Sequence, residues 1–379
     1  MVNSCFLNLL SLYNQGQPLQ LWIDRDHYRH YRNKPAGVSL KYKKVIQPKK
    51  SNRVLWILKL LSEVLLITNI VFKAKRASVK IVFFSSLSPL GNWYLSVLIP
   101  ILNRTSKFVI VLHGELELAK SSKWTKRIEN IYGKLLRSSF RTKISNRRFL
   151  ILGSAVLRNV LKNNLLARKD VICIEHPYIF EENPHVISHA GDLLPQIVFG
   201  QLGVAKLAKQ YHLIFKLAEE MKDFIEDGII RFEIVGQVFE EIRPFINPYV
   251  SFQETDAFIS RNEYDNKGRS LSYALFFYDE QSYEFTSSGA IMDAIAYEKP
   301  IIGFNIKPFS NIFGTNDKCN PGYLFEDFES LLKSMKKIVA NHQSNYLNMV
   351  GCIKGKKQLF TVEAQFDSFK QQLDDLVNL

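Results

Sequence analysis

The stretch QIVFGQLGVAKLAKQYHLIFKLAEEMKDFIEDGIIRFEIVG, residues 196–236, decides the fold class. It contains two short apolar runs, Gln196–Gly200 and Ile230–Val235, and a glycine ends or follows each of them. The residues between them predict a helix from about residue 208 to residue 222. A strand, a helix and a second strand in this order form a βαβ unit, whose two strands lie parallel in one sheet.

The same alternation continues on both sides of this unit. Toward the C-terminus, strands are predicted at Leu271–Tyr278 and Pro300–Phe304, with a helix over residues 287–297 between them. Toward the N-terminus, the apolar runs Val79–Ser85 and Lys107–Leu112 alternate with helical stretches. Such alternation favours a parallel sheet with helices on both faces, and hence an α/β fold. The remaining predicted strands are 19–24, 149–152, 171–174 and 250–252, and the remaining helices are 3–14, 54–72, 93–102, 154–165, 256–265, 326–340 and 363–376.

The alternation is interrupted once, at residues 181–194, where proline and glycine occur without an apolar period. We therefore predict a linker there, between a domain of residues 1–180 and a domain of residues 195–362. Residues 363–379 are predicted to form a C-terminal helix that packs back on the first domain. The predicted architecture is two Rossmann-like doubly wound domains that face a central cleft.

The formal net charge of +14 is unevenly distributed. Residues 1–150 contain 27 Lys and Arg against 6 Asp and Glu, whereas residues 151–379 contain 23 against 30. The stretches 25–53 and 120–148 hold ten Lys and Arg each. We therefore expect the first domain to bind an anionic partner, such as a membrane surface or a nucleic acid. A basic domain whose charge serves only solubility is the alternative.

Residues 54–72 form the most apolar stretch of the chain, but Lys59 and Glu63 interrupt it. A charged residue near the centre of a membrane-spanning helix costs about 2.5–3.5 kcal/mol. We therefore predict a buried helix of a globular domain, which the nearby bases can press onto an anionic surface. The N-terminus shows neither the basic start nor the cleavage site of a secretory signal.

The four cysteines are far apart in the sequence and form no CxxC pair. This spacing argues against a disulfide scaffold and against a structural zinc site, and it favours a reducing compartment. The four residues are Cys5, Cys173, Cys319 and Cys352.

Small and basic residues follow the strand at 196–200. Gly203 lets a ligand approach the backbone closely, and Lys206 and Lys209 can neutralise phosphate groups. In open parallel sheets, ligands bind beyond the carboxyl ends of the strands. The segment is thus a candidate phosphate site, although an ordinary turn from strand to helix has the same pattern.

A second candidate lies at the start of the helix predicted for residues 287–297. The amides of Ser287, Ser288 and Gly289 and the helix dipole would suit a diphosphate. Asp293, about one and a half turns further, can accept hydrogen bonds from ribose hydroxyls. The alternative is an ordinary serine N-cap followed by a solvated aspartate.

His113 follows the buried strand at 107–112 and precedes Gly114, where the chain can turn. It is either a structural hydrogen-bonding residue or a residue that faces a ligand at a strand end. Glu115 and Glu117 are either candidates for a catalytic base or exposed turn residues.

The order of these motifs resembles the GT-B fold glycosyltransferases, in particular the retaining bacterial family of lipopolysaccharide and O-antigen enzymes. The motifs of the second half are the glycine turn with lysines, the strand ending at Val235-Gly236, and the serine-glycine helix that leads to Lys299–Ile302. The first half adds the segment VIVLHG at Val109–Gly114. The resemblance spans roughly residues 79–340.

The resemblance implies a role for each candidate residue. The catalytic residues would be His113, facing the donor sugar, and Glu284, near the transferred sugar. The residues that bind the donor nucleotide would be Gly203, Lys206, Lys209, Ser287, Ser288, Gly289 and Asp293.

Two positions depart from the family pattern. The paired acids of the family are eight positions apart, whereas Glu284 and Asp293 are nine apart. The arginine that usually follows the first glycine of the donor loop is replaced by Gln201.

The resemblance implies a metal-independent transferase that moves a hexose from a nucleotide diphosphate sugar to a polyprenyl-diphosphate-linked saccharide, with retention of configuration. We expect a UDP-sugar as donor, with galactose as the first hexose to test, and no further cofactor. Lysines and a helix N-terminus can stabilise the leaving diphosphate. The triplet Asp24-Arg25-Asp26 has the DxD pattern that other glycosyltransferases use for manganese, but it lies far from the donor loop in the sequence.

The basic first domain would then hold the acceptor. We expect a cytoplasmic protein that is peripheral on the inner face of the cell membrane and acts in O-antigen or other surface polysaccharide synthesis. Two alternatives remain: a nucleic-acid-binding protein that uses the basic half, although no RNA- or DNA-binding motif is present, and a nucleotide-sugar epimerase of the same fold.

Overall fold

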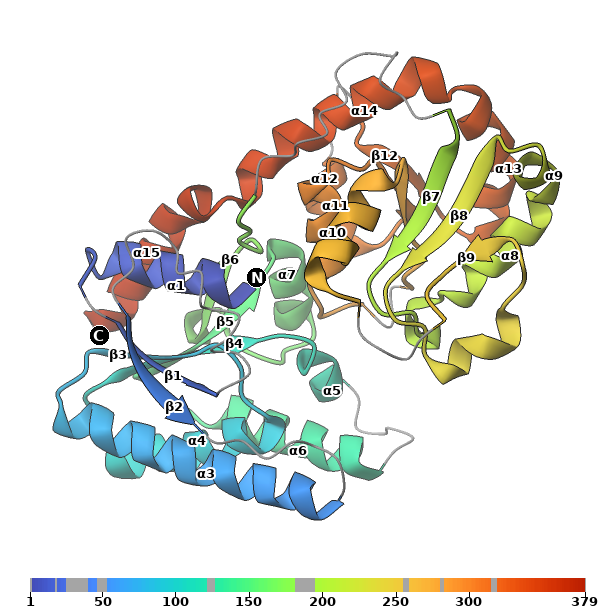
Figure 1. Ribbon diagram of the computed structural model, residues 1–379. Coiled ribbons are helices and arrows are strands. Elements are labelled where there is room, and N and C mark those ends of the chain that lie inside the picture. Colours follow the sequence, from blue (N-terminus) through green and yellow to red (C-terminus); the bar gives the residue numbers. More distant parts are fainter. Residues whose placement is uncertain are drawn as a thin grey trace. The chain divides into compact units, whose positions relative to one another are not determined.

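The computed structural model describes residues 2–17, 19–24, 40–45, 53–120, 127–180, 195–254, 259–279, 283–314 and 319–378. The chain forms two compact units (Figure 1). Unit 1 comprises Met1–Ile179, Phe285–Ser287 and Phe360–Leu379, and unit 2 comprises Phe180–Glu284 and Ser288–Leu359. The linker predicted for residues 181–194 lies outside the described residues.

Unit 2 contains a six-stranded parallel sheet with the order β12-β11-β10-β7-β8-β9. Counted along the chain from β7, this is the order 3-2-1-4-5-6 of a doubly wound Rossmann sheet, read from the opposite edge. The strands are β7 (Ile197–Leu202), β8 (Ile230–Val235), β9 (Val250–Ser251), β10 (Tyr273–Phe276), β11 (Ile301–Phe304) and β12 (Gly322–Phe325).

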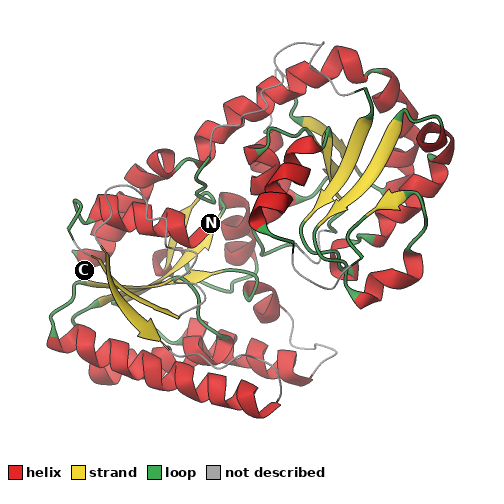
Figure 2. Cartoon of the chain, viewed as in Figure 1, coloured by secondary structure: helices red, strands yellow, loops and turns green. Residues whose placement is uncertain are grey.

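Aromatic side chains hold the central strands of this sheet together. Phe199 of β7 stacks on Phe232 of β8 with ring centroids 5.5 Å apart, and on Tyr273 of β10 at 5.2 Å. The three residues are direct neighbours in the strand register, so the stacks are cross-strand pairs. Helices flank both sides of the sheet (Figure 2): α8 (His212–Glu220), α9 (Lys222–Glu226), α10 (Arg261–Ser270), α11 (Gly289–Ala296), α12 (Ser310–Phe313), α13 (Phe328–Ala340) and α14 (His342–Lys357).

Unit 1 contains a four-stranded parallel sheet whose strands follow one another in chain order. The strands are β3 (Ile81–Phe84), β4 (Lys107–Leu112), β5 (Arg147–Leu152) and β6 (Val171–Ile174). A separate parallel pair is formed by β1 (Leu19–Asp24) and β2 (Leu40–Val45).

Alternate residues of β4 face two different helical layers, as the two-residue period of a strand requires. Phe108, Ile110 and Leu112 belong to one apolar cluster, and Val109 and Val111 belong to another. The first cluster includes residues of α3 (Arg53–Arg76), α4 (Pro89–Leu102), α6 (Arg127–Arg141) and α7 (Ser154–Lys162). The second includes residues of α1 (Val2–Tyr13) and α15 (Val362–Val377).

Most predicted strands are confirmed, and those at Lys107–Leu112 and Ile230–Val235 have the predicted bounds. The helix predicted for residues 93–102 begins earlier than expected, because α4 already starts at Pro89. The Ser88 hydroxyl caps this helix by accepting a hydrogen bond from the amide of Gly91. Proline fits the first helical position, because a backbone amide there would have no partner within the helix. The elements that were not predicted include β2, α5 (Leu116–Lys120), α6, α9, α12, β12 and α14.

The apolar stretch at residues 54–72 is part of one long helix, α3. The prediction of a buried helix is correct for only one of its faces, since Ile67 and Val71 are buried whereas Leu65 is 70% exposed. In the described part of the chain, no helix combines the length and the apolar character needed to cross a membrane.

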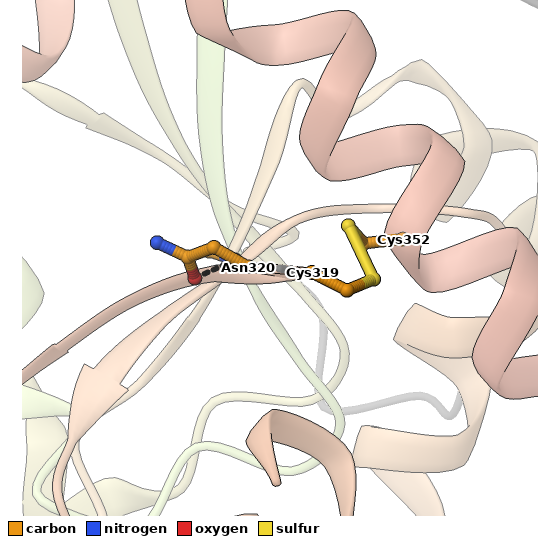
Figure 3. The surroundings of a disulfide bond; sticks show 4 residues. Cys319, Asn320 and Cys352 are labelled. Carbon is orange, nitrogen blue, oxygen red and sulfur yellow. Dashed lines mark hydrogen bonds between the residues drawn. A yellow bond between two sulfur atoms is a disulfide. The ribbon is translucent and has the colours of Figure 1, made fainter. Parts of the chain in front are cut away.

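A disulfide joins Cys319 to Cys352 within unit 2 (Figure 3). The cysteine spacing argues against a disulfide scaffold and does not predict this single bond. The two residues are 33 positions apart, and their Cα atoms lie 5.4 Å apart because the segment before β12 packs against α14. A rule based on neighbouring cysteines cannot detect a pair that only tertiary packing brings together.

Candidate functional site

The strand order of unit 2 reverses direction between β7 and β10, which are hydrogen-bonded neighbours. The carboxyl ends of two such strands diverge into helices on opposite sides, and this switch point is where ligands bind in doubly wound sheets. The segments that leave β7 and β10 here begin with Gly203 and Phe277.

Gly203 has a backbone φ of +94°, which a residue with a side chain rarely adopts. Its amide donates a hydrogen bond of 2.9 Å to the carbonyl of Val235. Gly236, which follows β8, packs directly against it: a Cβ atom on Gly236 would overlap the carbonyl oxygen of Gly203. The two glycines therefore let the loops after β7 and β8 approach each other closely.

Lys209 lies beside this glycine pair. Its ammonium group is 3.7 Å from the position that a Cβ atom would take on Gly203, and it lies 5.9 Å from the ring centroids of Tyr211 and Tyr278. Burial, with a smaller contribution from the nearby charge of Lys206, lowers the pKa of Lys209 from 10.5 to about 8. No acidic side chain within the described ranges forms an ion pair with this lysine.

The start of α11 belongs to the same place in unit 2. Ala290 lies 3.7 Å from the Cβ position of Gly203. Ser288 is the N-cap residue, and its hydroxyl lies 3.3 Å from the hydroxyl of Tyr278, which stacks on Tyr283. The structure thus brings Gly203, Lys209 and the first turn of α11 together at the switch point.

Lys206 lies one short turn before Lys209, and its ammonium group is 4.6 Å from the ring centroid of Phe239. Gln201, which stands where the family has an arginine, is completely buried within β7. No described residue forms a hydrogen bond with its amide group. A side chain enclosed in the sheet in this way is not placed to contact a bound phosphate.

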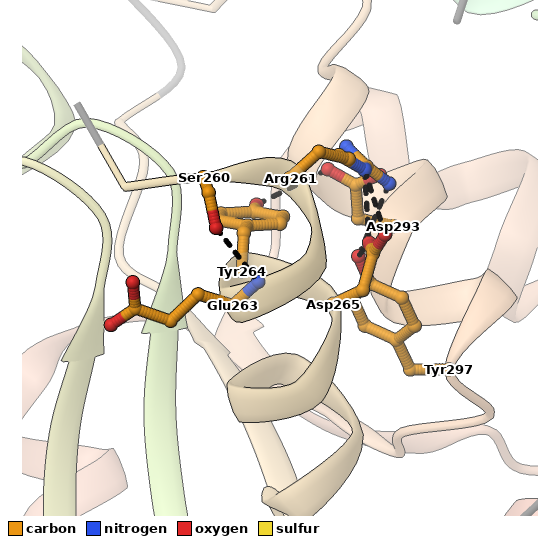
Figure 4. Close-up of polar contacts among 7 residues, drawn as sticks. All are labelled: Ser260, Arg261, Glu263, Tyr264, Asp265, Asp293 and Tyr297. Carbon is orange, nitrogen blue, oxygen red and sulfur yellow. Dashed lines mark hydrogen bonds and ion pairs between the residues drawn. The ribbon is translucent and has the colours of Figure 1, made fainter.

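Asp293 is buried on α11 and is held by two residues of α10 (Figure 4). Arg261 Nη2 donates to one carboxylate oxygen at 3.0 Å, and the hydroxyl of Tyr264 donates to the other at 3.1 Å. Burial, together with the charge of Asp293, raises the pKa of Tyr264 and of Tyr297. The alternative of a solvated aspartate is wrong, because this carboxylate is part of a buried polar network.

The structure divides four further predicted residues between the two units. His113 and Ser287 belong to unit 1, and the His113 Nε2 atom lies 3.0 Å from the carbonyl of Ser85 at the end of β3. Glu284 is half-buried, and it is the last residue of the first segment of unit 2. Gly289 is exposed at the first position of α11.

The acids next to His113 are not exposed turn residues. The Glu117 carboxylate accepts hydrogen bonds from the amide of Phe285 at 2.7 Å and from the hydroxyl of Thr286 at 3.1 Å, all within unit 1. Phe285 is buried in the apolar cluster of that unit. Burial raises the pKa of Glu115.

Sequence reasoning missed Tyr278 and Arg261. Tyr278 follows β10 at the switch point, so the strand-end rule that selected Lys209 also applies to it. Arg261 gives no local signal, because its partner Asp293 is 32 positions away. Among the described residues, no group of three or more His, Cys, Asp or Glu could hold a metal ion, and most of the DxD triplet lies outside them.

No protein-family model matches the sequence, and no curated protein matches it. Solved structures do match. HepE of Anabaena, in complex with UDP and glucose, superposes with a TM-score of 0.65 at 11% identity, over 100% of this chain and 96% of that chain. Sucrose-phosphate synthase of Thermosynechococcus elongatus has a TM-score of 0.65 at 12% identity, over 96% and 99%.

A glycosyltransferase of Rickettsia africae also matches, with a TM-score of 0.61 at 10% identity, over 100% of this chain and 94% of that chain. These neighbours are glycosyltransferases of the GT-B type, with two Rossmann-like domains. This chain has the GT-B fold. The likeness extends over both units, so the six-stranded sheet of unit 2 and the four-stranded sheet of unit 1 are the two sheets of a GT-B chain.

Proposed function

We propose that this protein is a glycosyltransferase that binds the diphosphate of a UDP-sugar at the switch point of unit 2. Lys209 is the observation that carries the proposal. Lys209 is largely buried, its pKa is lowered, and it lacks an acidic partner among the described residues. A bound anion would stabilise the charged form of such a lysine. The neighbours of the same fold include HepE structures in complex with UDP and with UDP-glucose.

The chemistry follows from the groups around Lys209. Transfer breaks the bond between the anomeric carbon and the diphosphate oxygen, so negative charge develops on the leaving UDP. The ammonium groups of Lys209 and Lys206 and the amides at the start of α11 would stabilise that charge. We propose that Ser287, Ser288 and Gly289 contribute these amides, that Gly203 admits the diphosphate, and that no metal ion is needed.

The remaining candidates take finer roles. We propose that Asp293 binds the ribose, that His113 and Glu284 act next to the transferred sugar, and that configuration is retained. The acceptor in this proposal is a polyprenyl-diphosphate-linked saccharide at the cytoplasmic face of the membrane, in O-antigen or another surface polysaccharide pathway. The basic composition of residues 1–150 supports an anionic acceptor.

A nucleotide-binding screen tests the donor site. Purified protein is titrated with UDP, GDP, CMP and dTDP, and binding is measured by thermal shift and calorimetry. We expect UDP to stabilise the protein and Lys209→Ala to lose at least about tenfold in affinity, since one charge-assisted contact contributes about 1.5–3 kcal/mol. Lys216→Ala is the matched control, because Lys216 is an exposed lysine of unit 2 that forms an exposed ion pair with Glu329.

Two outcomes would contradict the proposal. One is unchanged UDP binding in Lys209→Ala. The other is an absence of binding to every nucleotide combined with tight, salt-sensitive binding of single-stranded RNA, which would support the nucleic-acid alternative. If UDP binds, hydrolysis of UDP-galactose and UDP-glucose in parallel assays identifies the hexose, with galactose tested first.

A further inference from the structure

The outer face of α3 is apolar and exposed. Ile57, Leu58, Leu61, Leu65 and Phe72 are all exposed, and their spacing places them within an arc of about 100° on the helix. The buried residues of α3 lie on the face that packs on the sheet. A stable helix of a globular domain normally has polar residues on its outer face, so this pattern is unusual.

The two neighbouring helices also have exposed apolar residues. α4 contacts both α3 and α6, and the three helices cover the same face of the unit 1 sheet (Figure 1). Ile101 is 71% exposed, Val97 one turn earlier is also exposed, and α4 contains no charged residue. On α6, Ile128 and Ile131 are exposed.

The charges at the edges of this surface are positive. Lys75 and Arg76 are exposed at the C-terminal end of α3, on the same arc as Leu65 and Phe72. On α6, a shallow hollow of about 420 Å³ is lined by Lys134, Arg137, Ser138, Arg141 and Thr142. The hollow is wide enough to receive a phosphate group.

Acids hardly offset these bases. The three helices contain only two acids, Glu63 and Glu129, and both are half-buried. The Glu63 carboxylate is engaged inside the unit, where it accepts hydrogen bonds from the amide of Ser88 at 2.8 Å and from its hydroxyl at 2.6 Å.

We infer that the outer face of α3, α4 and α6 docks on a bilayer with anionic headgroups. Apolar side chains would enter the interface to a depth of about 5–10 Å, and each nearby base would contribute about 1 kcal/mol at an anionic surface. A second copy of the chain fits this face poorly, because a two-fold contact would place its bases against each other. The inference rests on the membrane-bound acceptor of the proposed function, and it identifies the face of unit 1 that meets the membrane.

Vesicle sedimentation tests this inference. The full-length protein is mixed with vesicles of phosphatidylcholine, with or without phosphatidylglycerol, at low and high salt. We expect binding to the anionic vesicles only, and weaker binding at high salt. Leu65→Glu and Ile101→Glu should each reduce partitioning by about tenfold or more, because each replaces an inserted apolar side chain with a charge. Leu12→Glu is the matched control, since Leu12 is an exposed leucine on α1, which covers the opposite face of the sheet.

A double variant, Lys134→Glu with Arg141→Glu, tests the electrostatic part of the inference. It should remove the preference for anionic vesicles. Equal binding by Leu65→Glu and wild type, or equal loss in Leu12→Glu, would overturn the inference. The inference would also be overturned if the wild type bound no vesicles and sedimentation velocity showed it to be a dimer that Leu65→Glu converts to a monomer. UDP binding is measured on every variant, and because it depends on unit 2 it should stay unchanged. Loss of vesicle binding alone is thus distinguishable from failure of the donor-site proposal.

Discussion

The Arg261 guanidinium lies 3.0 Å from the Asp293 carboxylate, and this ion pair joins α10 to α11. Tyr264 occupies the second oxygen of the same carboxylate, so both oxygens already have a donor. If Asp293 binds ribose, the hydroxyls of the ribose must share these oxygens with Arg261 and Tyr264. The pair thus has a structural role in addition to any role toward a nucleotide.

Asp293→Ala should lower the free energy of unfolding by about 1–3 kcal/mol, because it leaves the buried Tyr264 hydroxyl without its acceptor and removes one of the two carboxylates that pair with Arg261. Urea unfolding of the purified variant measures the change. Glu263→Ala, on α10, is the control, since it removes an exposed ion pair with Lys267 and should cost only about 0.5 kcal/mol. Similar losses in both variants would show that the buried network adds nothing to stability.

UDP binding should weaken as the pH rises through about 8. The free protein holds the pKa of Lys209 at about 8, and a diphosphate binds the protonated ammonium form. Above this pH the protonated fraction falls, so the dissociation constant should rise by up to about tenfold per pH unit. Calorimetry across this range measures it. Lys209→Arg should remove the decline, because a guanidinium stays charged. A decline that persists in this variant would assign the titration to another group.

Gly236→Ala should damage both the stability of unit 2 and its affinity for UDP. The new Cβ would overlap the carbonyl oxygen of Gly203, and the residue would keep an unfavourable φ of +148°. We expect a loss of about 2 kcal/mol or more in the free energy of unfolding, together with weaker UDP binding. Gly228→Ala separates the two causes, because Gly228 also has a positive φ, +71°, but nothing lies near its Cβ position. It should cost about 1 kcal/mol and leave UDP affinity unchanged.

Removal of the Cys319–Cys352 disulfide should lower the stability of unit 2 by about 2–4 kcal/mol, since the bond closes a loop of 33 residues in the unfolded chain. Thermal unfolding with and without dithiothreitol measures the effect. The reductant should lower the Tm of the wild type and have no effect on Cys319→Ser. Cys173→Ser serves as a control, because Cys173 is a free cysteine of unit 1. If dithiothreitol leaves the wild-type Tm unchanged, the disulfide does not contribute to stability.

Much of the fold could be predicted because strands and helices have local periods. Lys107–Leu112 is apolar after its first residue and is a strand, and the βαβ unit at residues 196–236 is present with the predicted strands. The helix α14 was missed because its apolar residues show no clear helical period, and β12 was missed because its start falls on Pro321-Gly322, a pair typical of turns. In both cases tertiary packing stabilises an element that the local sequence pattern does not predict.

The candidate site could be predicted in part for the same reason. Gly203 and Lys209 follow a recognisable strand, and Ser288 precedes a recognisable helix, so the strand-end rule selected them. That rule does not say what surrounds each side chain. Lys209 lies near Tyr211 and Tyr278, which belong to two separate segments of unit 2, and burial at this place lowers its pKa.

The sequence by itself determined the α/β class, the basic character of the first half and the glycine and lysine residues at the strand ends, because these depend on composition and on neighbours within a few positions. Only the tertiary structure decided which distant residues pair. Cys319 with Cys352, Arg261 with Asp293 and the exposure of Leu65 on α3 depend on the packing of whole elements. The physical reason is that a side chain's burial and partners are set by all the segments around it, whereas its period along the chain reports only on its own segment.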